Sequence, residues 1–223
     1  MKKVTTKFIA SGAAFVLFLI FTFLVKLLDV AAIGPLESSV GLSTINSAIF
    51  ELFGVSEFWE KLTEIIGVAA IAVALGFCLL GAYQLIKRRS LSKVDHSILL
   101  LGAFYALVVI VYVLFEMVVI NYRPILVDGV LEASYPSSHT MLVVCITTSA
   151  MTAIGDIFKD KKRLVLVSDV IFSLMLALMV AGRLLSGVHW FTDIIGGVLI
   201  SIVLTSLYSA FVDLVGYKKS LKE

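Results

Sequence analysis

Long apolar stretches separated by short polar segments dominate the hydropathy pattern of this chain. Six of them are long enough to cross the ~30 Å hydrocarbon core of a bilayer, which takes roughly 20 helical residues. None alternates apolar and polar positions as a strand would, and only helices or closed barrels can span lipid. The pattern therefore predicts an all-α bundle of six transmembrane helices, at Phe8–Leu28, Ile65–Ile86, Ile98–Ile120, Ser138–Gly155, Leu164–Leu185 and His189–Val212.

The first apolar stretch follows Lys2 and Lys3, as the hydrophobic region of a signal peptide would. It is long for such a region, and no clear small-x-small cleavage site follows it. We therefore expect a retained helix.

The distribution of basic residues predicts how the six helices are oriented. Fourteen of the 18 Lys and Arg residues precede the first span or follow spans two, four and six, so they share one side of the membrane. The positive-inside rule assigns that side to the cytoplasm. We expect a multi-pass protein of the cell membrane with both termini cytoplasmic. The fourteen are Lys2, Lys3, Lys7, Lys87, Arg88, Arg89, Lys93, Lys159, Lys161, Lys162, Arg163, Lys218, Lys219 and Lys222.

The segment 29–64 between the first two spans is acidic and would face outward. Within it, Ile45, Ile49, Leu52 and Phe53 recur at helical spacing. This spacing indicates an amphipathic helix, either lying on the outer leaflet or capping the bundle.

Composition agrees with a membrane protein and narrows the function classes. Hydrophobic residues make up 60% of the 223 residues and charged residues 15%, against about 25% charge in soluble domains. A net charge of +2 gives no reason to expect a nucleic-acid partner. Cys78 and Cys145 lie in apolar stretches, so we expect small buried residues rather than a disulfide or a metal site. We expect residues 1–223 to form a single membrane domain.

Three short polar motifs fall at the ends of the last four spans. They read Arg123-Pro124, Pro136-Ser137-Ser138-His139 and Arg183-x5-His189-x3-Asp193. The predicted orientation places all three on the extracytoplasmic face, although the charge count did not use them. An intramembrane aspartate is costly and marks a functional site by default. The joint pattern therefore predicts one site on this face.

The first part of this pattern suits phosphate binding. Arg123 and Arg183 offer planar forks of N–H donors that match phosphate oxygens. The Ser137-Ser138 turn would begin a helix, where unpaired backbone N–H groups and the positive end of the helix dipole attract anions.

The second part suits transfer of the phosphoryl group. His189 and Asp193 are four residues apart, so on one helix their side chains would share a face. Asp193 can accept the proton of one imidazole nitrogen and leave the other free as a nucleophile. His139 could protonate the leaving oxygen as a general acid.

Taken together, R-P, P-S-x-H and R-x5-H-x3-D resemble the three-part signature of the type-2 phosphatidic acid phosphatases, which share a site with vanadium haloperoxidases. The motif core covers residues 116–193, and the six-span layout extends the resemblance to the whole chain. The resemblance implies metal-independent hydrolysis of a lipid phosphate at the outer face, without a cofactor. It implies that His189 forms a phosphohistidine, that Asp193 orients it and that His139 is the general acid. It also implies that Arg123, Arg183, Ser137 and Ser138 hold the phosphate.

The sequence departs from the family pattern at three positions. Ser138 replaces the usual glycine, which we expect to be mild because the cradle uses backbone N–H groups. Gly182 replaces the usual serine and removes one hydrogen bond. Glu116 replaces a lysine, so an anion stands where a cation is usual. We hypothesise that Glu116 tunes the site by orienting Arg123 or by contacting a cationic group of the substrate; the alternative is that it touches neither.

The expected activity is therefore that of a phosphatase acting on a lipid phosphate or diphosphate, with membrane lipids as its surroundings. Polyprenyl diphosphate, phosphatidic acid and phosphatidylglycerol phosphate are the candidate substrates, and the outward-facing site slightly favours the first. The alternative is a lipid-phosphate binding protein or phosphotransferase relative whose hydrolysis is weakened by Glu116 and Gly182. A transporter fits less well, because the polar residues gather at one face rather than at the midplane.

Overall fold

The computed structural model of the chain describes residues 2–221. Within this range the regular structure is helical, with seven α-helices and two short 3₁₀ turns at Pro35–Glu37 and Leu91–Lys93. Six of the helices are long and apolar enough to cross a membrane, which confirms the predicted all-α class and the number of spans. They are α1 (Lys2–Leu27), α3 (Glu57–Arg88), α4 (His96–Met117), α5 (Ser138–Ile157), α6 (Lys162–Ser186) and α7 (Phe191–Ser220). The seventh helix, α2 (Ser43–Phe53), is short.

Some helices extend beyond the predicted spans, because hydropathy marks only the length that would cross lipid. Helix α3 begins at Glu57 rather than Ile65, and acidic residues in its first turn complement the positive end of the helix dipole. It ends with Lys87 and Arg88, whose charges suit the opposite end of the dipole. Helix α7 continues to Ser220, past the predicted limit at Val212.

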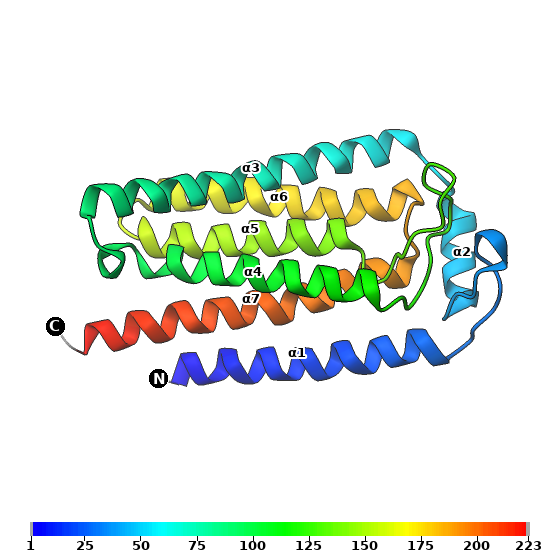
Figure 1. Ribbon diagram of the computed structural model, residues 1–223, viewed down its shortest axis with the longest axis horizontal. Helices are drawn as coiled ribbons and strands as arrows, with labels where there is room; N and C mark the ends of the chain where they lie inside the picture. Colours follow the sequence, from blue (N-terminus) through cyan, green and yellow to red (C-terminus); the bar gives the residue numbers. More distant parts are fainter. Residues whose placement is uncertain (1, 222–223) are drawn as a thin grey trace.

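Helix α5 is the centre of the bundle. It packs against α3, α4, α6 and α7, whereas α1 packs chiefly along α7 (Figure 1). Its most apolar 18-residue window is 56% buried, against 6% for that of α6, so α5 forms the core and α6 presents most of its surface outward. Cys145 on α5 is buried as expected, but Cys78 on α3 is exposed, so the prediction for Cys78 was wrong.

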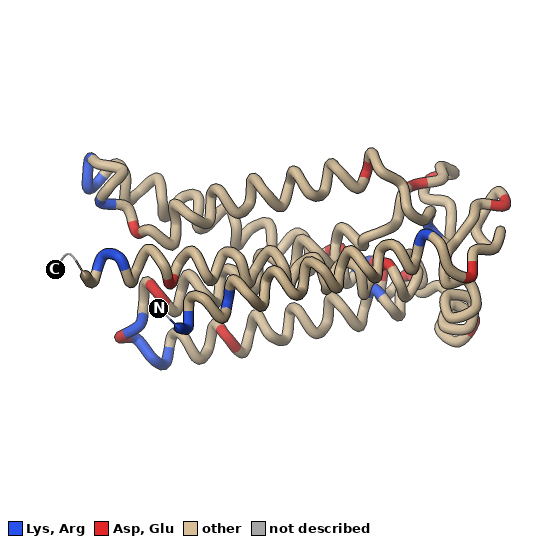
Figure 2. The backbone as a smooth tube through the Cα atoms, turned by 90° about the horizontal axis from the view of Figure 1, so that it is seen from below, with Lys and Arg blue, Asp and Glu red and all other residues tan. Residues whose placement is uncertain are grey.

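Charged residues divide the bundle into two different ends. Lysines and arginines cluster at the end that holds the described termini, the α3–α4 connection and the α5–α6 connection (Figure 2). We call this the basic end; Lys222 lies outside the described residues. The opposite end, here called the site end, holds α2 and the segment 118–137, which connects α4 to α5 (Figure 1).

Helix α2 lies across the site end where the apolar spacing predicts a helix. Asp29 accepts hydrogen bonds from Thr44 N (2.7 Å) and Ser43 Oγ (3.0 Å) and so anchors its first turn. The hydrogen bond from the Thr44 backbone is the main reason that the pKa of Asp29 is lowered. Ile45, Leu52 and Phe53 are exposed, while Ser43 and Asn46 are buried. The helix therefore turns Asn46 toward the bundle, where Phe50 also packs against Trp190, and leaves Ile45 and Leu52 on the outside.

Candidate active site

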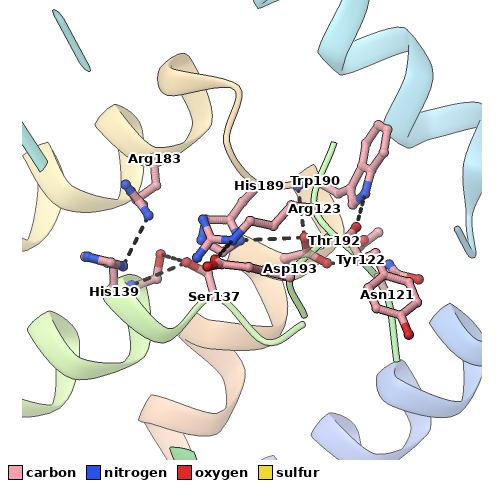
Figure 3. A network of polar contacts seen from close by, with 12 residues as sticks. Asn121, Tyr122, Arg123, Ser137, His139, Arg183, His189, Trp190, Thr192 and Asp193 are labelled. Atoms are coloured by element: carbon pink, nitrogen blue, oxygen red, sulfur yellow. Dashed lines mark hydrogen bonds and ion pairs between the residues drawn. The ribbon is translucent and has the colours of Figure 1, made fainter. Parts of the chain in front are cut away.

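The three motifs converge at the site end, around the start of α5 (Figure 3). Ser137 is the N-cap of α5, and its Oγ accepts a hydrogen bond from Thr140 Oγ1 at 3.0 Å. The Ser137 N–H donates to the Asp193 carbonyl oxygen at 2.9 Å, which ties α5 to α7. Ser137 therefore acts in helix capping. The first N–H groups of a helix have no partner within it, so those of Ser138 and His139 are the ones that an anion at this helix start could accept from.

Arg183 reaches the site from the last turn of α6 and is only 2% exposed. Its Nη1 donates to Thr63 Oγ1 of α3 at 3.2 Å, and its Nη2 lies 3.1 Å from His139 Nδ1. A guanidinium group can only donate, so His139 Nδ1 is the acceptor. The proton of the neutral His139 ring must then be on Nε2.

His189 and Asp193 form a buried pair, as their spacing predicts. The distance from His189 Nδ1 to Asp193 Oδ2 is 3.8 Å, longer than a hydrogen bond. Asp193 Oδ2 also accepts from Trp190 N at 2.9 Å, so this carboxylate caps the first turn of α7. His189 precedes α7 rather than lying within it, so the predicted start of the sixth span at His189 was wrong. The pair meets because Asp193 turns back across the N-terminus of the helix.

Both ring nitrogens of His189 are buried and lack a hydrogen-bond partner among the described residues. Burial, together with the positive charges of Arg183 and Arg123, holds the pKa of His189 well below its usual range. The imidazole is therefore neutral near pH 7, which is the nucleophilic form of the ring.

Arg123 comes from the segment 118–137, which folds back on itself. Its N–H donates to the Glu132 carbonyl oxygen at 3.0 Å, and its Nε lies 3.1 Å from Glu132 Oε2. Because Glu132 approaches Nε, the two terminal amino groups of the guanidinium remain available for another anion. Sequence reasoning missed Glu132; its only signal was an acidic residue shortly after the Arg-Pro motif.

Glu116 lies in the last turn of α4 and is exposed. It lines a small pocket together with Ser134 and Ser138, so its carboxylate neighbours the start of α5. The acidic group that contacts Arg123 is that of Glu132. Among the described residues Glu116 forms no ion pair with Arg123, and its contact with a cationic group of the substrate stays a prediction beside the alternative that it touches neither.

The close approach of α3 and α6 gives Gly182 a packing role. A Cβ atom at this position would lie 2.6 Å from Thr63 Cγ2, closer than real Cβ contacts. The hydroxyl of the same threonine accepts from Arg183. Glycine at position 182 thus allows α3 to supply a hydroxyl group to the arginine. Motif reading alone could not identify Thr63.

Comparisons with known proteins bear on the superfamily and on the fold. Residues 118–216 match the model of the PAP2 superfamily, and through this region the chain belongs to that superfamily. Its fold is similar to the crystal structure of the first transmembrane PAP2 type phosphatidylglycerolphosphate phosphatase from Bacillus subtilis. The TM-score is 0.65 at 18% sequence identity, and the match covers 91% of this chain and 95% of the other. No curated protein matches the sequence significantly.

Proposed function

We propose that the protein is a membrane phosphatase that hydrolyses a lipid phosphate or diphosphate through a phosphohistidine. The observation that carries the proposal is the convergence of Arg183, His139 and the His189–Asp193 pair at one end of a membrane-type bundle. Membership of the PAP2 superfamily supports the same activity. The fold relative is described as a phosphatidylglycerolphosphate phosphatase, which keeps that lipid among the candidate substrates beside polyprenyl diphosphate and phosphatidic acid.

In the proposed reaction, Arg123, Arg183 and the first N–H groups of α5 hold the phosphate. His189 attacks phosphorus in line. The bond from phosphorus to the leaving oxygen breaks as His139, in its protonated form, transfers a proton to that oxygen and becomes neutral. Water then attacks the phosphohistidine, gives a proton back to His139 and releases inorganic phosphate. Positioning and charge stabilisation would provide most of the acceleration, as they generally do in phosphoryl transfer.

The distribution of charge supports an orientation for this site. Because lysines and arginines gather at the basic end, we place that end in the cytoplasm and the site end outside. The headgroup would then be hydrolysed at the outer leaflet while its chain stays in lipid.

Release of inorganic phosphate in detergent, with EDTA present, tests the proposal. The substrates are polyprenyl diphosphate, phosphatidic acid and phosphatidylglycerol phosphate, and the proteins are wild type, His189→Ala and His96→Ala. The last is a matched control, because His96 starts α4 at the basic end and is the only other histidine besides His139.

We expect release that survives EDTA, persists in His96→Ala and disappears in His189→Ala. A 32P label carried by the wild-type chain and absent from His189→Ala would identify the intermediate. Folded wild-type protein that binds these lipids and releases no phosphate would refute the proposal. It would favour a binding protein or phosphotransferase relative, in which the anionic Glu116 beside the phosphate cradle weakens hydrolysis.

A further inference from the structure

Asn121 connects the Asp193 carboxylate to a part of the chain far away in sequence. Its side chain is buried, with 1% of the residue exposed. Its Oδ1 accepts a hydrogen bond from Gly41 N at 3.1 Å, and its Nδ2 donates to Asp193 Oδ1 at 3.4 Å (Figure 3). Its carbonyl oxygen accepts from Ser134 N at 3.0 Å, which holds the residue in the folded-back segment 118–137.

The backbone at Gly41 determines which way the Asn121 amide points. A backbone N–H can only donate, so the atom facing Gly41 must be the amide oxygen. The NH₂ group then faces Asp193 and donates to its Oδ1. The other carboxylate oxygen, Oδ2, is left for Trp190 N and for the side facing His189. The amide thus selects which oxygen of Asp193 faces the histidine.

Gly41 is itself held from both sides. Its carbonyl oxygen accepts from Asn46 Nδ2 at 2.9 Å. Asn46 also bonds Thr192, the neighbour of Asp193. Asn46 Nδ2 donates to Thr192 Oγ1 (2.9 Å), and the Thr192 backbone N–H donates to Asn46 Oδ1 (3.2 Å). A Cβ atom at position 41 would lie 1.4 Å from the Val25 carbonyl oxygen, so only glycine fits. The two asparagines of the chain therefore hold Gly41 and the start of α7 as one unit.

We propose that Asn121, fixed by Gly41 and Asn46, is a positioning residue that aims Asp193 at His189. This inference rests on the proposed function, because it assigns Asn121 to the pair that would form the phosphohistidine. It also makes the α1–α2 connection and α2 part of the site, although both lie outside the region 118–216 that matches the superfamily. Neither asparagine touches the phosphate in this proposal.

The test uses Asn121→Asp, which keeps the size of the side chain and removes the NH₂ donor. At pH 8 the introduced carboxylate would place an acceptor oxygen, instead of a donor, against the Asp193 carboxylate. We therefore expect kcat for a lipid phosphate to fall about 10- to 100-fold, the effect of losing a hydrogen bond to a charged group. KM should change less than about twofold, because the arginines and the α5 N-terminus are untouched. Protonation would restore an O–H donor to the introduced group, so the kcat ratio to wild type should recover between pH 8 and pH 5.

Asn121→Ala provides the comparison, since it removes both contacts without adding a titratable group. It should show a similar loss of kcat with no recovery at acid pH. It also keeps the proposal testable if Asn121→Asp does not fold. Unchanged kcat in Asn121→Ala, or a rise in KM without a fall in kcat, would overturn the inference. Wild-type protein without phosphate release would instead overturn the proposed function, so the two failures are distinguishable.

Discussion

Substituting Gly182 by serine restores the residue that the family usually has, and we expect it to damage this protein. The new Cβ would lie 2.6 Å from Thr63 Cγ2, so the threonine would have to turn away. Its Oγ1 now accepts from Arg183 Nη1 at 3.2 Å and donates to the backbone of its own helix, at Trp59 O and Glu60 O. A rotation that removes the clash would also move this hydroxyl away from Arg183.

The size of the effect follows from these contacts. Overpacking a close helix contact costs about 1–3 kcal/mol of stability. Loss of a hydrogen bond to a charged group is worth about 1.5–3 kcal/mol, or roughly 10- to 100-fold in kcat/KM if it is lost in full. Thr63→Ser removes the Cγ2 methyl group and keeps the hydroxyl. The double variant should therefore recover most of the loss.

The assay is a double-mutant cycle on phosphate release and on the thermal midpoint in detergent. Wild type, Gly182→Ser, Thr63→Ser and the double variant give a coupling free energy, which we expect to exceed about 1 kcal/mol in favour of the double variant. Gly182→Ser with activity at or above wild type would refute the reasoning. So would a double variant no better than Gly182→Ser alone, since the clash would then lie elsewhere.

Three further predictions concern charge. Glu132→Gln removes the ion pair that orients Arg123, so it should raise KM for the lipid phosphate with little change in kcat. The rise should be only about twofold to fivefold, because this ion pair is partly exposed. A fall in KM would show that Glu132 competes with the phosphate instead. The wild-type protein should have a higher kcat/KM for a single-chain lipid phosphate that carries an ammonium group than for its counterpart without the amine. Glu116→Gln should reduce this ratio about fivefold, because ~1 kcal/mol of attraction between water-exposed charges is lost. The same ratio in both proteins would exclude the contact. The acid limb of kcat/KM should lie below pH 6.5, because the lowered pKa of His189 keeps the ring neutral there; a limb at or above pH 6.5 would contradict this.

The scaffold was predictable because each span must be apolar over most of its length. Hydropathy therefore located the six long helices, and it missed the first turns of α3 because Glu57, Glu60 and Glu64 interrupt the apolar pattern there. The site residues were recognisable because their spacing is short and their types are chemically specific.

The residues that support the site were not recognisable in this way. Asn46, Asn121 and Thr63 are single polar residues that contact the motifs only after distant segments have come together. One signal was available and overlooked: the chain has only two asparagines, and both are buried in the same network. Motif reading also did not show that the Ser137 N–H bonds the Asp193 carbonyl oxygen and that its hydroxyl caps α5; its contact with phosphate stays a prediction.

The packing of α1 along α7 has a consequence for biogenesis. Helix α1 is synthesised well before α7, its main partner, so α1 must wait in the membrane until α7 has been made. The loop that follows α1 contributes Gly41 to the site, and this loop cannot be locked before Asn121 and Thr192 have been made. A chain that stalls before α7 would hold five inserted helices and no assembled site. The candidate site therefore assembles only once α7 has been made, and until then membrane quality control would encounter α1 without its main partner.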